Sequence, residues 1–168
     1  MADHSDIAAS MEQLFEGAET TGQKVEALLS KMSLEEKVGQ MLQGERYVVT
    51  DSDMENLGLG SVLSGGGSYP GTNTLEDWEG MITYLQDGAT KNHIPMLYGI
   101  DAIHGVGHMY GAVIYPHNIG LGAANDPDLM YQMGAAAAEE MKLMKILWNF
   151  SPCVAVSPME NGEFFEIE

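Results

Sequence analysis

The 168-residue sequence is short of positive charge and of cysteine. Lysine and arginine together number seven, with Arg46 the single arginine, against 25 aspartate and glutamate residues. Binding of nucleic acid needs cations that replace the counterions of the phosphates, so this class of partner is excluded. Anionic membrane surfaces are disfavoured for the same reason. The single cysteine, Cys153, excludes an internal disulfide and a zinc site built from cysteines.

Long apolar runs are also missing. No window reaches the ~18 consecutive apolar residues that a transmembrane helix needs. The opening residues MADHSDIAASMEQ have no basic region followed by an apolar one, so no secretory signal is predicted. Hydrophobic residues make up 45% of the chain and charged residues 19%, which is typical of a globular protein. We therefore expect a soluble, acidic, cytoplasmic protein with a net charge of −18.

Helices and strands are expected to alternate along the chain. Residues 1–22 are acidic and poorly periodic, and we interpret them as an N-terminal extension or a loose helix. Ser33 followed three residues later by Glu36 predicts a capping box, and with it a helix over about 33–43. Apolar spacing predicts further helices at about 24–32, 74–92 and 126–145. Short apolar runs predict strands at 61–64, 96–101 and 146–156, the last of them broken by Ser151-Pro152. Residues 44–60 and 102–125 are expected to be loops. This alternation is typical of an α/β fold with parallel strands joined by right-handed crossovers.

Functional residues of such folds lie at the carboxyl ends of strands. The first such place is the glycine run Gly65–Ser68. Backbone amides of a glycine-rich turn can hold a phosphate, but no Lys-Ser/Thr pair follows here, so a sharp turn is the favoured interpretation.

The second place is the end of the strand at 96–101, where Asp101 follows apolar residues. A carboxylate there can accept hydrogen bonds from ligand hydroxyls. His104, His108 and His117 follow in the loop. A metal site is one interpretation of these histidines. The other, which we favour, is that they brace the loop, because glycines between His104 and His108 prevent a helical i, i+4 pair.

The third place is the segment 149–153, which contains Cys153. A lone cysteine in a strand is more often a small core residue than a nucleophile. No neighbouring base favours its thiolate form here.

Four collinear segments resemble the N-terminal part of glycoside hydrolase family 3, the β-glucosidase-like enzymes. They are LLSKMSLEEKVGQMLQ (28–43), GLGSVLSGGGSYP (58–70), IPMLYGIDAIHGVGHMYGAVIYPHNIGLGAANDPDLM (94–130) and ILWNFSPCVAV (146–156). The resemblance covers about residues 24–156. It implies a (β/α)₈ barrel, of which this chain holds an incomplete part with about three parallel strands and with N-terminal and crossover helices.

The resemblance also implies the chemistry. Retaining hydrolysis uses two carboxylates, a nucleophile and an acid/base. In the family the nucleophile lies on a late barrel strand and the acid/base lies further on, so we assign no catalytic residue in this chain. Asp101 corresponds to the aspartate of the family's YGIDAxHG motif, which accepts hydrogen bonds from the sugar in the first subsite. His104 of the same motif is expected to support the loop near that subsite. No metal and no cofactor are expected.

The family pattern is expected to break after about residue 156. The family typically continues with a segment of the Asp-Pro-Arg-Trp-Gly-Arg type, whereas this chain continues with residues 157–168, which have no family counterpart. We therefore predict three parts: an extension (1–22), the N-terminal portion of a family 3 barrel (23–156) and a non-family tail (157–168). A full barrel is typically about 250 residues, so the chain is expected to be a truncated barrel that cannot close alone.

Three functional hypotheses follow. The first is a fragment of a retaining β-glucosidase-like hydrolase of carbohydrate metabolism, inactive alone, that binds a β-linked glucoside or oligosaccharide weakly or not at all. The second is a module without catalysis that associates with itself or with a partner through the open barrel edges. The third, which we disfavour, is that acids of the tail complete an active site, because two positioned acids rarely arise in an unrelated segment.

Overall fold

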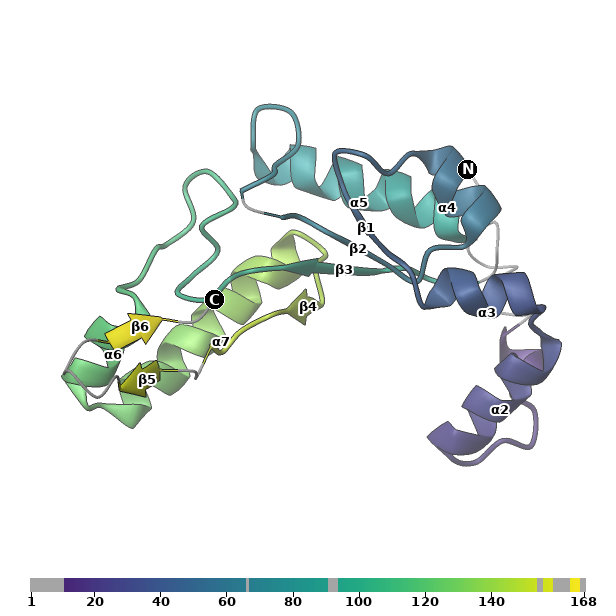
Figure 1. Cartoon of the computed structure of the whole chain (residues 1–168), viewed down its shortest axis with the longest axis horizontal. Coiled ribbons are helices and arrows are strands. Elements are labelled where there is room, and N and C mark those ends of the chain that lie inside the picture. The colour runs from purple at the N-terminus through teal and green to yellow at the C-terminus, as the bar shows by residue number, and fades with distance from the viewer. Residues whose placement is uncertain (1–10, 66, 91–93, 154–155, 159–163, 167–168) are drawn as a thin grey trace. The chain divides into compact units, whose positions relative to one another are not determined.

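The computed structural model describes residues 11–65, 67–90, 94–153, 156–158 and 164–166. Its main element is a sheet of strand order β1-β2-β3-β4, formed by β1 (Gln43–Glu45), β2 (Ser61–Leu63), β3 (Leu97–Ile100) and β4 (Trp148–Asn149). The pairs β1/β2 and β3/β4 are parallel, with Gly44 opposite Val62 and Gly99 opposite Trp148. The α/β class with parallel strands is therefore confirmed (Figure 1).

Two of the described helices precede β1 in the sequence, and the others lie between the strands of the sheet. The helices are α2 (Thr21–Lys31), α3 (Leu34–Gln40), α4 (Asp51–Leu57), α5 (Leu75–Thr90), α6 (Asn118–Ala124) and α7 (Pro127–Leu143). In the described part of the chain, no helix is both long and apolar enough to cross a bilayer.

The capping box predicted at the start of the second helix is confirmed. The Ser33 hydroxyl accepts from the Glu36 amide at 3.1 Å, and the Glu36 carboxylate accepts from the Ser33 amide at 2.7 Å. This satisfies two of the amides that the first turn of a helix leaves without an intrahelical partner. The helix ends at Gln40, three residues before the predicted end, because the chain enters β1 at Gln43.

Four expectations about the elements are wrong. The segment 44–60 is not a loop throughout, because it contains most of β1 and α4, and Thr50 caps α4 through the Asp53 amide. The segment 102–125 contains α6. The strand at 146–156, predicted with a break at Ser151-Pro152, does not continue in one sheet after the break, since β4 covers only two residues and β5 (Val156–Pro158) pairs antiparallel with β6 (Phe164–Glu166) in a separate sheet. The helix predicted from 24 begins earlier, at Thr21.

The chain divides into two compact units. The first comprises residues 1–63 and 83–97. The Gln86 side chain makes two hydrogen bonds to the backbone of Met96 in this unit. Its Nε2 donates to the Met96 carbonyl at 2.6 Å, and its Oε1 accepts from the Met96 amide at 3.1 Å. The buried apolar residues are Met54, Leu59, Val62, Leu85, Ala89 and Met96.

The second unit comprises residues 64–82 and 98–168 and contains Asp101. Trp78 is fully buried in it, edge-on to the Tyr98 ring at a centroid distance of 6.4 Å. Its other buried apolar residues are Ile82, Tyr98, Ile100, Ala102, Val106, Leu121, Ala137, Met141, Met144 and Ile146. These residues anchor the carboxyl end of β3 and the loop that follows it.

Candidate functional site

Asp101 lies directly after β3, at the carboxyl end of the strand. Its side chain is exposed, whereas Ile100 before it and Ala102 after it are buried. The alternation places the carboxylate in solvent while its neighbours fix the backbone in the core. This is the position at which parallel α/β folds carry ligand-binding groups.

The Asn149 side chain clamps the backbone immediately after Asp101. Its Oδ1 accepts from the Ala102 amide at 3.0 Å, and its Nδ2 donates to the Ala102 carbonyl at 3.3 Å. The same Oδ1 accepts from the Ser151 amide at 3.2 Å. The Phe150 amide also donates to the Ile100 carbonyl at 3.0 Å. The end of β4 therefore holds both neighbours of Asp101 in place.

His104 lies beside the backbone of Tyr115, further along the same loop. Its Nδ1 is 2.8 Å from the Tyr115 carbonyl, and the Tyr115 amide donates in return to the His104 carbonyl at 2.7 Å. The His104 and His117 rings lie 4.1 Å apart and are tilted by 39°. This geometry ties the start of the loop to its end, and the assignment of His104 as a support of a sugar subsite stays a prediction.

His108 packs against the core. Its ring is edge-on to Trp78 at 6.5 Å, and in the described part of the chain neither ring nitrogen has a hydrogen-bond partner. Burial lowers the pKa of His108, and the charge of Asp101 partly opposes that effect. The imidazole is therefore biased toward its neutral form close to Asp101.

Asn73 joins two loops around this core. It adopts a left-handed conformation, accepts from Trp78 Nε1 at 2.8 Å through its side chain, and accepts from the Tyr110 amide at 3.2 Å through its carbonyl. Asparagine tolerates this conformation better than most residues. Asn73 thus docks the loop after β3 onto the loop after β2.

The glycine-rich segment makes a turn next to a buried hydroxyl pair. Ser64 Oγ and Tyr98 Oη are 2.6 Å apart in the core, and the Ser68 amide donates to the Gly65 carbonyl at 3.0 Å. Gly67 has a positive φ of 89°. Ser68 is buried, and within the described residues its hydroxyl has no partner. Gly66 lies outside the described residues.

Cys153 is the remaining candidate. It is half-buried, and its carbonyl accepts from Asn118 Nδ2 at 2.7 Å. Among the described residues, no three His, Cys, Asp or Glu side chains come together as metal ligands. The roles of Asn73, Trp78 and Asn149 were not predicted from the sequence. Asn149 at the carboxyl end of a strand was the available signal, but its partner Ala102 is 47 residues away.

Known proteins place this fold and motif in one family. Residues 33–163 match the family described as "Glycosyl hydrolase family 3 N terminal domain". The chain is 29% identical over 153 residues to the lysosomal beta glucosidase of Dictyostelium discoideum, in a match that covers 79% of this chain and 18% of that protein.

Solved structures of family 3 enzymes are similar to this chain. The exo-1,3/1,4-β-glucanase of a Pseudoalteromonas species is 38% identical, with a TM-score of 0.74, over 80% of this chain and 18% of that one. A family 3 β-N-acetylglucosaminidase from a Paenibacillus species shares the fold, with 24% identity and a TM-score of 0.62 over 72% of this chain and 24% of that one. The chain thus spans less than a quarter of the length of each of these relatives, and the prediction of an incomplete barrel is confirmed.

The predicted boundary of the family segment at residue 156 stays a prediction. The extended family match and the shared fold establish the assignment itself: the chain belongs to glycosyl hydrolase family 3, of whose N-terminal domain it holds a part.

Proposed function

We propose that this chain carries the part of a family 3 glycoside hydrolase that holds the first sugar of a β-linked glucoside, with Asp101 as the residue that accepts hydrogen bonds from the sugar hydroxyls. The observation that supports this most directly is the exposed carboxylate at the end of β3, clamped between two buried neighbours. The names of two relatives, a beta glucosidase and an exo-1,3/1,4-β-glucanase, support glucose as the sugar.

In this proposal the 168 residues are not a catalyst by themselves. A retaining mechanism needs two carboxyl groups about 5 Å apart on either side of the scissile bond. The resemblance assigns both of them to later parts of the family's chain. Asp101 binds in this scheme and does not react.

The test is the binding of methyl β-D-glucoside to the purified chain, measured by saturation-transfer NMR. We expect a weak signal that Asp101→Asn and Asp101→Ala remove, because the amide loses acceptor strength and alanine loses the acceptor altogether. Asp128→Asn, an exposed carboxylate on α7, is the matched control and leaves the signal unchanged. Equal signals from the wild type and from Asp101→Ala would refute the role of Asp101.

Activity is measured on the same samples with an aryl β-glucoside. We expect hydrolysis at the uncatalysed rate for the wild type and for both Asp101 variants. Turnover by the wild type that Asp101→Ala abolishes would overturn the proposal that the chain is inactive alone.

A second candidate function is self-association through the sheet edges. It is favoured by Leu147, which precedes β4 and is 82% exposed, and by the strand order, in which β1 and β4 are the outer strands of the sheet. Outer strands present unpaired backbone groups to another chain. The size-exclusion profile of Leu147→Glu tests this candidate, and a loss of oligomers in that variant would support it.

A further inference from the structure

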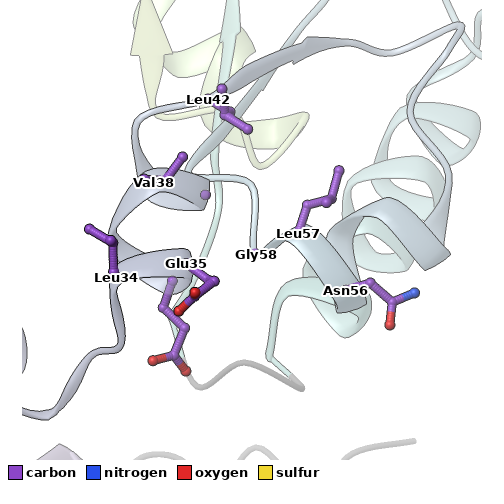
Figure 2. Close-up of a pocket in the computed structure, with 9 residues that line it drawn as sticks. Leu34, Glu35, Val38, Leu42, Asn56, Leu57 and Gly58 are labelled. Atoms are coloured by element: carbon purple, nitrogen blue, oxygen red, sulfur yellow. The ribbon is translucent and has the colours of Figure 1, made fainter.

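An apolar groove lies between α3 and α4 in the first unit. It has a volume of about 460 Å³, and its lining includes Leu34, Val38, Leu42 and Leu57. Figure 2 shows Leu34, Val38 and Leu42 on the side of α3, and Leu57 on the side of α4. Leu34 is 72% exposed and the other three are between 44% and 50% exposed, so the described residues leave this groove open to solvent.

Helix α2 of the same unit has an apolar stripe and no buried residue. Val25, Leu28 and Leu29 are spaced by three residues and one residue, which puts them on one face of the helix. Val25 and Leu29 are exposed and Leu28 is half-buried. An amphipathic helix of this kind is the element that apolar grooves between helices accept.

The α2 helix lies outside the groove of its own chain. Only Met32 and Ser33 separate α2 from α3, both in extended conformation, and the Ser33–Glu36 capping box fixes that junction. The groove begins at Leu34, immediately after it. The α2 helix of a second chain is not tied to this groove by the short α2–α3 junction.

Charge complements the apolar match. Lys24 and Lys31 are seven residues apart and flank the stripe of α2, whereas the groove is lined by Glu35 and Glu36. Together α3 and α4 carry five acidic residues and one lysine in a chain of net charge −18. Lys24 Nζ lies 5.9 Å from the Phe15 ring centroid and therefore already has an aromatic contact. Lys31 is the last residue of α2 and is the cation nearest to α3.

We propose that the α3–α4 groove accepts α2 of a second copy of this chain, and that α2 of the first copy enters the groove of the second. The exchange is reciprocal, so the dimer has two-fold symmetry and each copy contributes the same surface. Lys31 of one copy faces Glu35 of the other in this arrangement. The interface is independent of Asp101, which lies in the other unit.

The experiment is sedimentation equilibrium of the full chain over a range of concentrations. We expect a monomer–dimer equilibrium that Leu28→Glu on α2 and Val38→Glu in the groove each weaken about tenfold or more, as central apolar anchors do. Glutamate keeps a good helix propensity, and far-UV circular dichroism verifies that each variant is folded. Glu26→Lys, away from the stripe, is the matched control and leaves the dimer intact.

A charge-reversal pair tests the orientation separately. Lys31→Glu and Glu35→Lys should each weaken the dimer by about two- to fivefold, the range of an exposed ion pair, and the double variant should recover the affinity of the wild type. None of these variants should alter the NMR signal of methyl β-D-glucoside, so failure here is distinguishable from failure of the sugar site.

Three results would overturn the proposal. They are a wild type that stays monomeric at every concentration, a dimer that Leu28→Glu and Val38→Glu leave unchanged, and single charge reversals that the double variant does not rescue. A dimer that only Leu147→Glu removes would place the interface at the sheet edge instead.

Discussion

Gly99 of β3 lies directly opposite Trp148 of β4 in the parallel register, and the absence of a side chain at Gly99 makes room for aromatic rings. A Cβ at this position would come within 3.1 Å of the Trp148 ring and would collide with the Phe150 ring. The two rings pack edge-to-face, with centroids 4.9 Å apart. Glycine therefore permits the aromatic packing between β3 and β4, next to the strand end that carries Asp101.

Gly99→Ala should destabilise the second unit. The added methyl group forces the Phe150 ring to move inside a packed site, and such overpacking costs about 1–3 kcal/mol. Urea unfolding monitored by tryptophan fluorescence measures the loss. Gly134→Ala is the matched control, because this glycine lies within α7 with open space around it, and alanine there should stabilise the helix by about 0.5–1 kcal/mol. Equal stability of Gly99→Ala and the wild type would contradict the packing argument.

Asn149→Ala should loosen the backbone beside Asp101. The variant leaves the buried Ala102 amide without its acceptor, at a cost of about 1–3 kcal/mol. We expect faster hydrogen exchange at Ala102 and Ser151, together with weaker binding of methyl β-D-glucoside. Asn56→Ala removes an exposed amide that donates to Ser52 Oγ, and it should change neither quantity. Unchanged exchange at Ala102 in Asn149→Ala would show that the clamp is not needed.

The elements that depend on residues close together in the sequence were predicted correctly. Ser33 and Glu36 form the expected capping box, and Asp126 accepts from the Leu129 amide ahead of the proline that opens α7. The apolar run that ends in β3 placed Asp101 at a strand end from the sequence alone. The two caps depend on residues three apart, and the strand end depends on one contiguous apolar run.

The elements that were missed depend on distant partners. Gln43–Glu45 has little strand propensity, and it is a strand because it pairs with β2, eighteen residues on. The helix α6 contains two glycines and one buried residue, Leu121, so its sequence resembles a loop. In the site, Asn149 and Ala102 are brought together by the strand order, which a single sequence does not encode in any local pattern.

Asp77 should make stability depend on acid. The carboxylate accepts from the Thr72 and Thr74 hydroxyls at 2.8 and 2.9 Å and from their amides at 2.9 and 3.2 Å. The Thr72 hydroxyl bond, followed by the bonds from Thr74, lowers the pKa of Asp77. The stabilisation is therefore present above the unfolded pKa of about 3.9 and is lost as the pH falls through the lower folded pKa.

Asp77→Asn should consequently be less stable than the wild type at neutral pH, and the difference should shrink in acid. Urea unfolding at a series of pH values measures it. Glu26→Gln, a mid-helix residue of α2, is the control for removal of one negative charge. A difference that is constant with pH would contradict the role of the Asp77 carboxylate.

His108 should couple the site to pH. Burial lowers its pKa, and Asp101 partly restores it, so the unfolded chain binds a proton between the unfolded pKa of about 6.5 and the lower folded pKa while the folded chain does not. Stability should therefore fall as the pH drops through that window. His108→Gln removes the titrating group and should flatten this part of the pH profile.

The same pair gives a direct measurement on the folded chain. Asp101→Asn removes the negative charge that favours the imidazolium, so the pKa of His108 should fall further, and the Cε1 proton signal in NMR reports it. Asp128→Asn, an exposed carboxylate on α7, is the control and should leave the His108 titration unchanged. An identical His108 titration in the wild type and in Asp101→Asn would show that the two groups are not electrostatically coupled.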